Sequence, residues 1–124
     1  MSEICAVLRE SPFAGQHHIL DVASGTGNYT LRIAEECEHV QCVELNEGMI
    51  AQLKQKIEER GIKNVDVAQG YAQELKYPDD SFTAVVCTMA IHHFGVDGVR
   101  QFVREAARVV KPGGYVIINH HSAV

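Results

Sequence analysis

The sequence predicts an α/β protein with a mostly parallel sheet of about five strands and helices on both faces. Short β-rich apolar runs alternate along the chain with segments of helical period. Residues 82–87 form an apolar run, as expected of a strand that is covered on both faces. The length of 124 residues fits the ~100–200 residues of one domain, so we expect residues 1–124 to form a single domain.

The first predicted unit is a strand, a glycine-containing turn and a helix. Residues 18–22 are rich in β-formers and lead into the turn at residues 23–27. Residues 28–38 are predicted to be helical because apolar side chains recur near helical spacing, at Leu31, Ile33, Ala34 and Cys37.

The second unit has the clearest boundaries. Residues 39–44 form the next predicted strand, and Asn46 can cap the helix that follows it. This helix runs to about Arg60 and is ended by Gly61. Its apolar residues lie on one face, namely Met49, Ile50, Leu53 and Ile57. Residues 64–68 alternate in polarity and predict a third strand.

The last part of the chain completes the alternation. Residues 77–80 form a turn by their Pro and Asp content, and residues 82–87 form the fourth strand. Residues 96–110 have a helical apolar stripe, which residues 111–114 interrupt with Pro and Gly. Residues 115–118 form the fifth strand. The same helix carries a row of basic side chains, which we interpret as a solvated face, at Arg100, Arg104 and Arg108.

The parallel arrangement predicts where a ligand would bind. In such sheets ligands bind beyond the carboxyl ends of the strands. The segments that follow strands, and therefore share that edge, are 21–27, Glu44, 70–73, 88–93 and 119–121. Three histidines precede strands, so we expect them at the opposite edge and on the surface, namely His17, His18 and His39.

The composition excludes several classes of protein. The net charge of −5 disfavours a nucleic-acid partner, since non-specific binding depends on neutralising phosphates. No apolar run approaches the ~20 residues that cross a bilayer, and no targeting signal is visible, so we expect a cytoplasmic protein. Four cysteines without a CxxC pair predict neither disulfides nor a zinc site, and Cys42 and Cys87 are expected to be buried.

The glycine turn and Glu44 are the strongest signals of function. Gly25 and Gly27 can take positive φ and let ligand atoms approach the backbone. No lysine follows them, which excludes a Walker loop, and Thr30 stands where a dinucleotide fingerprint needs its third glycine. NAD is therefore a second candidate. Glu44 ends the second strand, where a carboxylate can accept hydrogen bonds from ribose hydroxyls.

These motifs resemble those of a known family. The segment 19–27, which reads ILDVASGTG, is similar to the first motif of class I S-adenosylmethionine-dependent methyltransferases. Further matches follow in family order at 43–46 with Met49, at 70–73 with 77–82, at 89–94 and at 108–114. The resemblance covers residues 19–119. It is closest to the small-molecule branch that includes the ubiquinone and menaquinone biosynthesis methyltransferases.

The resemblance implies S-adenosylmethionine as the cofactor and assigns roles to individual residues. The amino-acid part of the cofactor would be held by Asp21 and by the turn made of Ala23, Ser24, Gly25, Thr26 and Gly27. Glu44 would bind the ribose, while Leu45 and Met49 would cover the adenine. Tyr71, Ala72 and Gln73 would border the adenine amino group, and Thr88 and Met89 would lie under the sulfonium.

Two residues depart from the family pattern. Ala23 stands where glycine is usual, which is a mild change if its φ is negative. Tyr71 stands where an aspartate commonly contacts adenine, so stacking would replace that polar contact.

The catalytic assignment rests on a pair of histidines. His92 and His93 lie where a general base could act, and the alternative is that one of them packs against the sheet. Together with His120 and His121 they show no ligand spacing typical of a metal site, so none is expected. The acceptor would be an unidentified small molecule. The alternatives are an S-adenosylmethionine-binding module or fragment without a working acceptor site, and an NAD(P)-dependent oxidoreductase.

The resemblance also implies a Rossmann-like three-layer sandwich with strand order 3-2-1-4-5. The family sheet continues after the fifth strand with two more strands, which this chain lacks. Residues 115–118 would then be an apolar edge with unpaired backbone groups. We therefore expect either a fragment of a longer protein or a homodimer that covers this edge.

Overall fold

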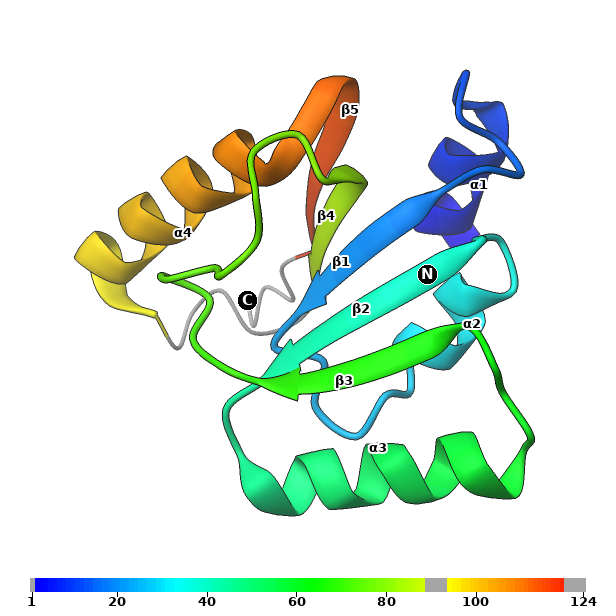
Figure 1. Cartoon of the computed structure of the whole chain (residues 1–124). Coiled ribbons are helices and arrows are strands. Elements are labelled where there is room, and N and C mark those ends of the chain that lie inside the picture. The colour runs from blue at the N-terminus through cyan, green and yellow to red at the C-terminus, as the bar shows by residue number, and fades with distance from the viewer. Residues whose placement is uncertain (1, 89–93, 120–124) are drawn as a thin grey trace, which may run out of the picture.

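The computed structural model describes residues 2–88 and 94–119 and has one five-stranded sheet (Figure 1). All the strands pair in parallel, in the order β3-β2-β1-β4-β5. The strands are β1 (His18–Val22), β2 (His39–Glu44), β3 (Val65–Gln69), β4 (Phe82–Thr88) and β5 (Val110–Asn119). The helices are α1 (Ser2–Glu10), α2 (Thr30–Ala34), α3 (Glu47–Glu59) and α4 (Gly95–Val109). The predicted fold class and strand order are confirmed.

Helices cover both faces of the sheet because alternate residues of each buried strand point to opposite sides. On one face, Ile19 and Val40 pack with Leu8 of α1, Ile33 of α2 and Leu53 of α3. The other face packs against α4 in a second cluster, formed by Leu20, Val22, Val85, Phe102, Ala106 and Val109. The result is three layers, with α4 alone among the described helices on its side (Figure 1).

Helix α3 begins and ends as predicted. The side chain of Asn46 accepts a hydrogen bond from the Met49 N–H at 3.0 Å, which caps the first turn. Gly61 follows the helix with φ of +62°, a conformation that glycine adopts without strain. These two residues fix the direction in which α3 leaves β2.

Three elements differ from the sequence prediction. Helix α1 was not predicted, although Ile4 and Leu8 are spaced for one helical face and are buried. Helix α2 is shorter than residues 28–38, because Asn28 and Tyr29 belong to the turn that precedes it. Strand β5 begins at Val110, directly after α4, and its pairing with β4 shifts register between Phe82 and Ala84.

The prediction that His17 is a surface residue is wrong. His17 is fully buried, with Nδ1 2.7 Å from Thr83 Oγ1 and Nε2 2.9 Å from the carbonyl oxygen of Leu8. It lies at the predicted edge of the sheet, opposite the carboxyl ends of the strands, but helix α1 covers it and shields it from solvent. His18 and His39 are partly exposed.

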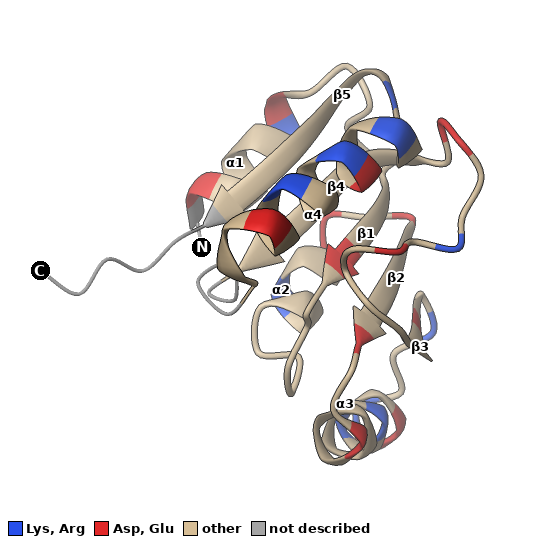
Figure 2. Ribbon diagram, turned by 90° about the vertical axis from the view of Figure 1, so that its left-hand side faces the viewer, with Lys and Arg blue, Asp and Glu red and all other residues tan. Residues whose placement is uncertain are grey.

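The basic row on α4 does not behave as one solvated face. Figure 2 marks the positions of basic residues along this helix in blue, and Arg100 and Arg104 are exposed. Arg108 instead donates hydrogen bonds to the carbonyl oxygens of Leu75 and Tyr77 and to the carboxylates of Asp79 and Glu105. The prediction of a solvated side chain is therefore wrong for Arg108.

The buried cysteines are confirmed, since Cys42 and Cys87 have no exposed surface. Among the described residues, no helix is both long enough and apolar enough to cross a membrane.

Candidate functional site

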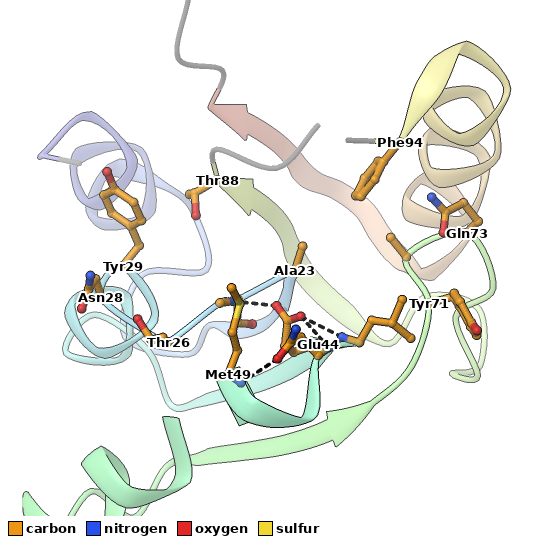
Figure 3. A pocket seen from close by; sticks show the side chains of 15 residues that line it. Ala23, Thr26, Asn28, Tyr29, Glu44, Met49, Tyr71, Gln73, Thr88 and Phe94 are labelled. Atoms are coloured by element: carbon orange, nitrogen blue, oxygen red, sulfur yellow. Dashed lines mark hydrogen bonds between the residues drawn. The ribbon is translucent and has the colours of Figure 1, made fainter. Parts of the chain in front are cut away.

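A cavity of about 1030 Å³ lies at the carboxyl edge of the sheet (Figure 3). It is bordered by the turn after β1, the end of β2 with the start of α3, and the segment after β3. Thr88 at the end of β4 and Phe94 before α4 complete its wall. The predicted cofactor residues that line it are Ala23, Ser24, Gly25, Thr26, Glu44, Leu45, Met49, Tyr71, Ala72, Gln73 and Thr88.

Glu44 lies in the middle of the cavity, and backbone N–H groups hold its carboxylate. Oε1 accepts a hydrogen bond from Gly25 at 2.8 Å, and Oε2 accepts from Leu45 and Asn46 at 2.9 Å each. A carboxylate offers about four lone-pair positions, so about one on Oε1 is left for a ligand. The acid is therefore rigid and aimed into the cavity before any ligand binds.

The turn after β1 brings backbone close to the cavity. Gly25 has φ of +61°, and a Cβ added to it would meet no protein atom within 4 Å. Ala23 has φ of +57°. The replacement of the usual glycine by alanine would be mild only at negative φ, so this condition is not met. An L-residue in this region is disfavoured by about 1–2 kcal/mol.

Gly27 is required for packing, and it is not among the residues that line the cavity. A Cβ at this position would lie 2.2 Å from Leu53 Cδ1, so any larger side chain would push the turn away from α3. With φ of +86°, it also needs a conformation that only glycine adopts freely.

Asp21 lies beneath the turn and does not line the cavity either. It is fully buried, and its Oδ2 accepts a hydrogen bond from the Thr30 hydroxyl. Its Oδ1 has no hydrogen-bond partner in the described part of the chain. Burial raises the pKa of this carboxyl to about 7, although hydrogen bonds from Thr30 and Ser24 act in the opposite direction.

One end of the cavity is apolar and open. Leu45, Met49 and Tyr71 are 49%, 41% and 57% exposed, which is unusual for such large side chains unless a ligand or partner covers them. Figure 3 shows Tyr71, Gln73 and Phe94 at this end, with Thr26, Asn28 and Tyr29 at the other. The cavity thus offers exposed apolar side chains, a central carboxylate and a polar turn.

Sequence reasoning missed four of the residues that line the cavity: Asn28, Tyr29, Asn46 and Phe94. Asn28 and Tyr29 directly follow Gly27, and the prediction that the helix began at Asn28 hid their place in the turn. Asn46 lies in the family match at 43–46, but the only role assigned to it was that of a helix cap. Phe94 lies in the family match at 89–94, but it was assigned no role in the site.

Three predicted residues lie outside the described residues: Met89, His92 and His93. The same holds for His120 and His121. In residues 2–88 and 94–119, no group of three or more His, Cys, Asp or Glu side chains is arranged to hold a metal ion.

The cavity fits the cofactor that the sequence motifs imply. S-adenosylmethionine has a flat aromatic base, a ribose with two hydroxyls and a charged amino-acid tail. These parts correspond to the exposed apolar side chains, to the free position on Glu44 and to the open backbone at Gly25. The volume of about 1030 Å³ is close to the upper limit of the ~300–1,000 Å³ range that is typical of small-molecule sites.

Comparison with known proteins agrees with the family resemblance of the sequence and with the fold. The family model described as "Methyltransferase domain" matches residues 19–114. The uncharacterized methyltransferase YcgJ of Bacillus subtilis (strain 168) is 32% identical over 117 residues, which are 94% of this chain and 46% of YcgJ. A demethylmenaquinone methyltransferase of Listeria welshimeri is 35% identical over 100 residues, covering 78% of this chain and 42% of that protein.

Solved structures show the same architecture. The crystal structure of YcgJ superposes with a TM-score of 0.86 at 31% identity, covering 98% of this chain and 50% of that one. A SAM-dependent methyltransferase from Aquifex aeolicus gives a TM-score of 0.69 at 24% identity, covering 77% and 52%. At that identity the second likeness shows the fold alone.

The chain belongs to the methyltransferase domain family. It spans about half the length of the relatives that it matches.

Proposed function

We propose that this chain is the cofactor-binding part of an S-adenosylmethionine-dependent methyltransferase that acts on a small-molecule acceptor. The observation that carries the proposal is Glu44, a carboxylate fixed by three backbone N–H groups between an apolar surface and a glycine turn. Membership of the methyltransferase domain family supports it.

In this proposal Glu44 accepts a ribose hydroxyl at the free position of Oε1. Leu45, Met49 and Tyr71 cover the base, and Ala72 and Gln73 border its amino group. The turn formed by Ala23, Ser24 and Gly25 contacts the amino-acid tail, and Thr88 faces the sulfonium. Asp21 and Gly27 act from behind the turn, where burial and packing hold its shape.

Bound S-adenosylmethionine supplies a methyl group that is already activated by a positively charged sulfur. The task of the protein is then to orient the groups and to exclude water, and near-attack positioning can contribute ~7–11 kcal/mol. The turn and Glu44 hold the donor end in place. His92 and His93 remain our candidates for a base that accepts a proton from the acceptor.

The acceptor class follows from the relatives rather than from the cavity. The demethylmenaquinone methyltransferases among them make quinol-type aromatic compounds the first acceptors to test. We retain a single domain of residues 1–124 and a cytoplasmic location as parts of the proposal.

Isothermal titration calorimetry with S-adenosylhomocysteine, S-adenosylmethionine and NAD tests the proposal directly. We expect the two sulfur nucleosides to bind and NAD not to bind, because Thr30 replaces the glycine that a pyrophosphate needs. Binding of NAD alone would overturn the proposal. Cofactor binding without turnover of any quinol acceptor would favour the alternative, a binding module without a working acceptor site.

A further inference from the structure

A lysine outside the cavity holds one of its ends. Lys56 lies on α3 and does not line the cavity, yet its Nζ is 3.0 Å from the carbonyl oxygen of Thr26 and 3.0 Å from Asn28 Oδ1. Thr26 and Asn28 both line the cavity, at the end opposite Tyr71 (Figure 3). The lysine thus connects α3 to the glycine turn across 28 to 30 residues of sequence.

The turn needs such a contact because its backbone is intrinsically permissive. Gly25 and Gly27 flank Thr26, and both have positive φ, so this stretch of chain has many accessible conformations when it is unconstrained. Within the turn, the Gly27 N–H donates to the Ser24 carbonyl at 3.1 Å, which leaves the Thr26 carbonyl directed toward α3. An ammonium donor to these two oxygens gives charge-assisted hydrogen bonds, which are stronger than neutral ones.

Lys56 is also a positive charge that its contacts place at this end. Among the described residues that line the cavity, Glu44 is the charged one, and no lysine or arginine is present. A ligand with a carboxylate at the turn would therefore have the ammonium of Lys56 one layer behind the turn. Lys56 itself is only partly exposed, so its charge is less screened than that of a fully exposed lysine.

We propose that Lys56 is a positioning residue that makes the cavity select ligands with an amino-acid tail. This inference rests on the proposed function. By fixing Thr26 and Asn28 it holds the turn in the form that receives the tail, and it leaves the nucleoside end unaffected. Affinity for a nucleoside with the tail depends on Lys56, whereas affinity for the same nucleoside without the tail does not.

Calorimetry with two ligands tests this selectivity. S-adenosylhomocysteine carries the amino-acid tail, and 5′-methylthioadenosine lacks most of it while keeping the base, ribose and sulfur. For Lys56→Met we expect about tenfold weaker binding of S-adenosylhomocysteine, equivalent to ~1.4 kcal/mol, and a change below twofold for 5′-methylthioadenosine. Lys56→Arg, which keeps a donor and the charge, should recover most of the lost affinity.

Two further variants control for structural damage. Lys54→Met removes an exposed lysine from the same helix and should change neither affinity. Asn28→Ala removes one acceptor of Lys56 without altering α3, and it should produce a smaller loss of the same selective kind. If Lys56→Met does not fold in a thermal melt, Asn28→Ala and Lys56→Arg decide the question.

The outcomes separate this inference from the proposed function. If Lys56→Met weakens the binding of both ligands equally, or of neither, the role of Lys56 is overturned while the proposed function stands. Failure of the unaltered protein to bind either ligand overturns the proposed function, and the inference fails with it.

Discussion

The Glu44 carboxylate accepts a hydrogen bond from the Gly25 N–H at 2.8 Å and so connects the end of β2 to the turn after β1 (Figure 3). The acid that we assign to the ribose and the turn that we assign to the amino-acid tail are therefore one hydrogen-bonded unit. Because Leu45 and Asn46 donate to the other oxygen, the start of α3 belongs to the same unit. A change at Glu44 should affect both ligand affinity and the shape of the turn.

We predict that Glu44→Gln weakens binding of S-adenosylhomocysteine about 10- to 100-fold. An amide has one acceptor oxygen and a donor group, so it cannot accept from all three N–H groups and a ribose hydroxyl. Hydrogen bonds to charged groups contribute about 1.5–3 kcal/mol, which corresponds to this range. Calorimetry at matched ionic strength measures the effect.

The matched control is Glu47→Gln, which changes the same functional group three residues later in the exposed first turn of α3. It should leave the affinity within twofold of the unaltered protein. Unchanged affinity in Glu44→Gln would remove Glu44 from the site.

The conformation of Ala23 leads to a prediction about stability. Ala23→Gly should raise the free energy of unfolding by about 0.5–1 kcal/mol, because relief of positive φ outweighs the extra freedom that glycine has in the unfolded chain. Urea denaturation followed by circular dichroism gives the value. Ala51→Gly, in the exposed interior of α3, should have the opposite sign and lower stability by about 1 kcal/mol. A destabilised Ala23→Gly protein would contradict this account.

The parts of the fold that sequence reasoning predicted well are those with local signals. Asn46 and Gly61 define α3 because a cap and a left-handed glycine act within a few residues. Glu44 was found because the end of a parallel strand defines a ligand edge. Helix α1 was missed because Ile4 and Leu8 become buried only against the finished sheet.

The residues that were missed or misjudged depend on distant contacts. His17 is bonded to Thr83, 66 residues away, and Lys56 contacts a turn 28 to 30 residues earlier in the chain. Arg108 contacts carbonyl oxygens 31 and 33 residues away. No local pattern of charge or period distinguishes these side chains from solvated ones, so the structure was needed to find them.

The buried carboxyl of Asp21 predicts a specific dependence of stability on pH. Its pKa in the folded protein is about 7, above its ordinary value of 3.8. Between these values the folded state keeps a proton that the unfolded state has lost, so the contribution of Asp21 to stability falls as the pH rises from about 4 to 7. Asp21→Asn is neutral throughout and removes this contribution.

The difference in unfolding free energy between Asp21→Asn and the unaltered protein should therefore grow with pH by about 1.4 kcal/mol per unit across that window. Glu105, whose pKa Arg108 lowers, has the opposite dependence, but it is present in both proteins and cancels in the difference. Urea titrations at intervals of half a pH unit measure the slope. A flat difference for Asp21→Asn would contradict the prediction.

The contacts of Arg108 predict a structural effect at the nucleoside end of the cavity. Its guanidinium is 2.8 Å from the carbonyl oxygens of Leu75 and Tyr77, and Glu105 Oε1 accepts from the Leu75 N–H at 2.8 Å. These bonds hold the segment that begins with Tyr71 against α4. Arg108→Met should lower the free energy of unfolding by an amount in the lower part of the range of about 1–3 kcal/mol. The lower part applies because the Arg108 side chain is a third exposed, and solvent screens its interactions.

The same variant should weaken binding of S-adenosylhomocysteine and of 5′-methylthioadenosine by similar factors, since both ligands carry the base. Arg104→Met, one turn earlier and exposed, should change stability by less than about 0.5 kcal/mol. If Arg108→Met weakened the binding of S-adenosylhomocysteine but not of 5′-methylthioadenosine, Arg108 would act on the end that receives the amino-acid tail. That result would contradict the prediction.

The outer edge of β5 predicts self-association of the 124-residue chain. In the described sheet β5 pairs with β4 alone, and Val116 and Ile118 are 38% and 39% exposed. A parallel edge strand with apolar side chains is an open template for pairing, so we expect a dimer whose population rises with concentration in sedimentation velocity. Ile118→Lys should shift the equilibrium toward monomer, because a charge on an edge strand opposes pairing. Val96→Lys, at a residue of α4 that is 71% exposed, should leave the equilibrium unchanged, and a monomer at all concentrations for the unaltered chain would refute the prediction.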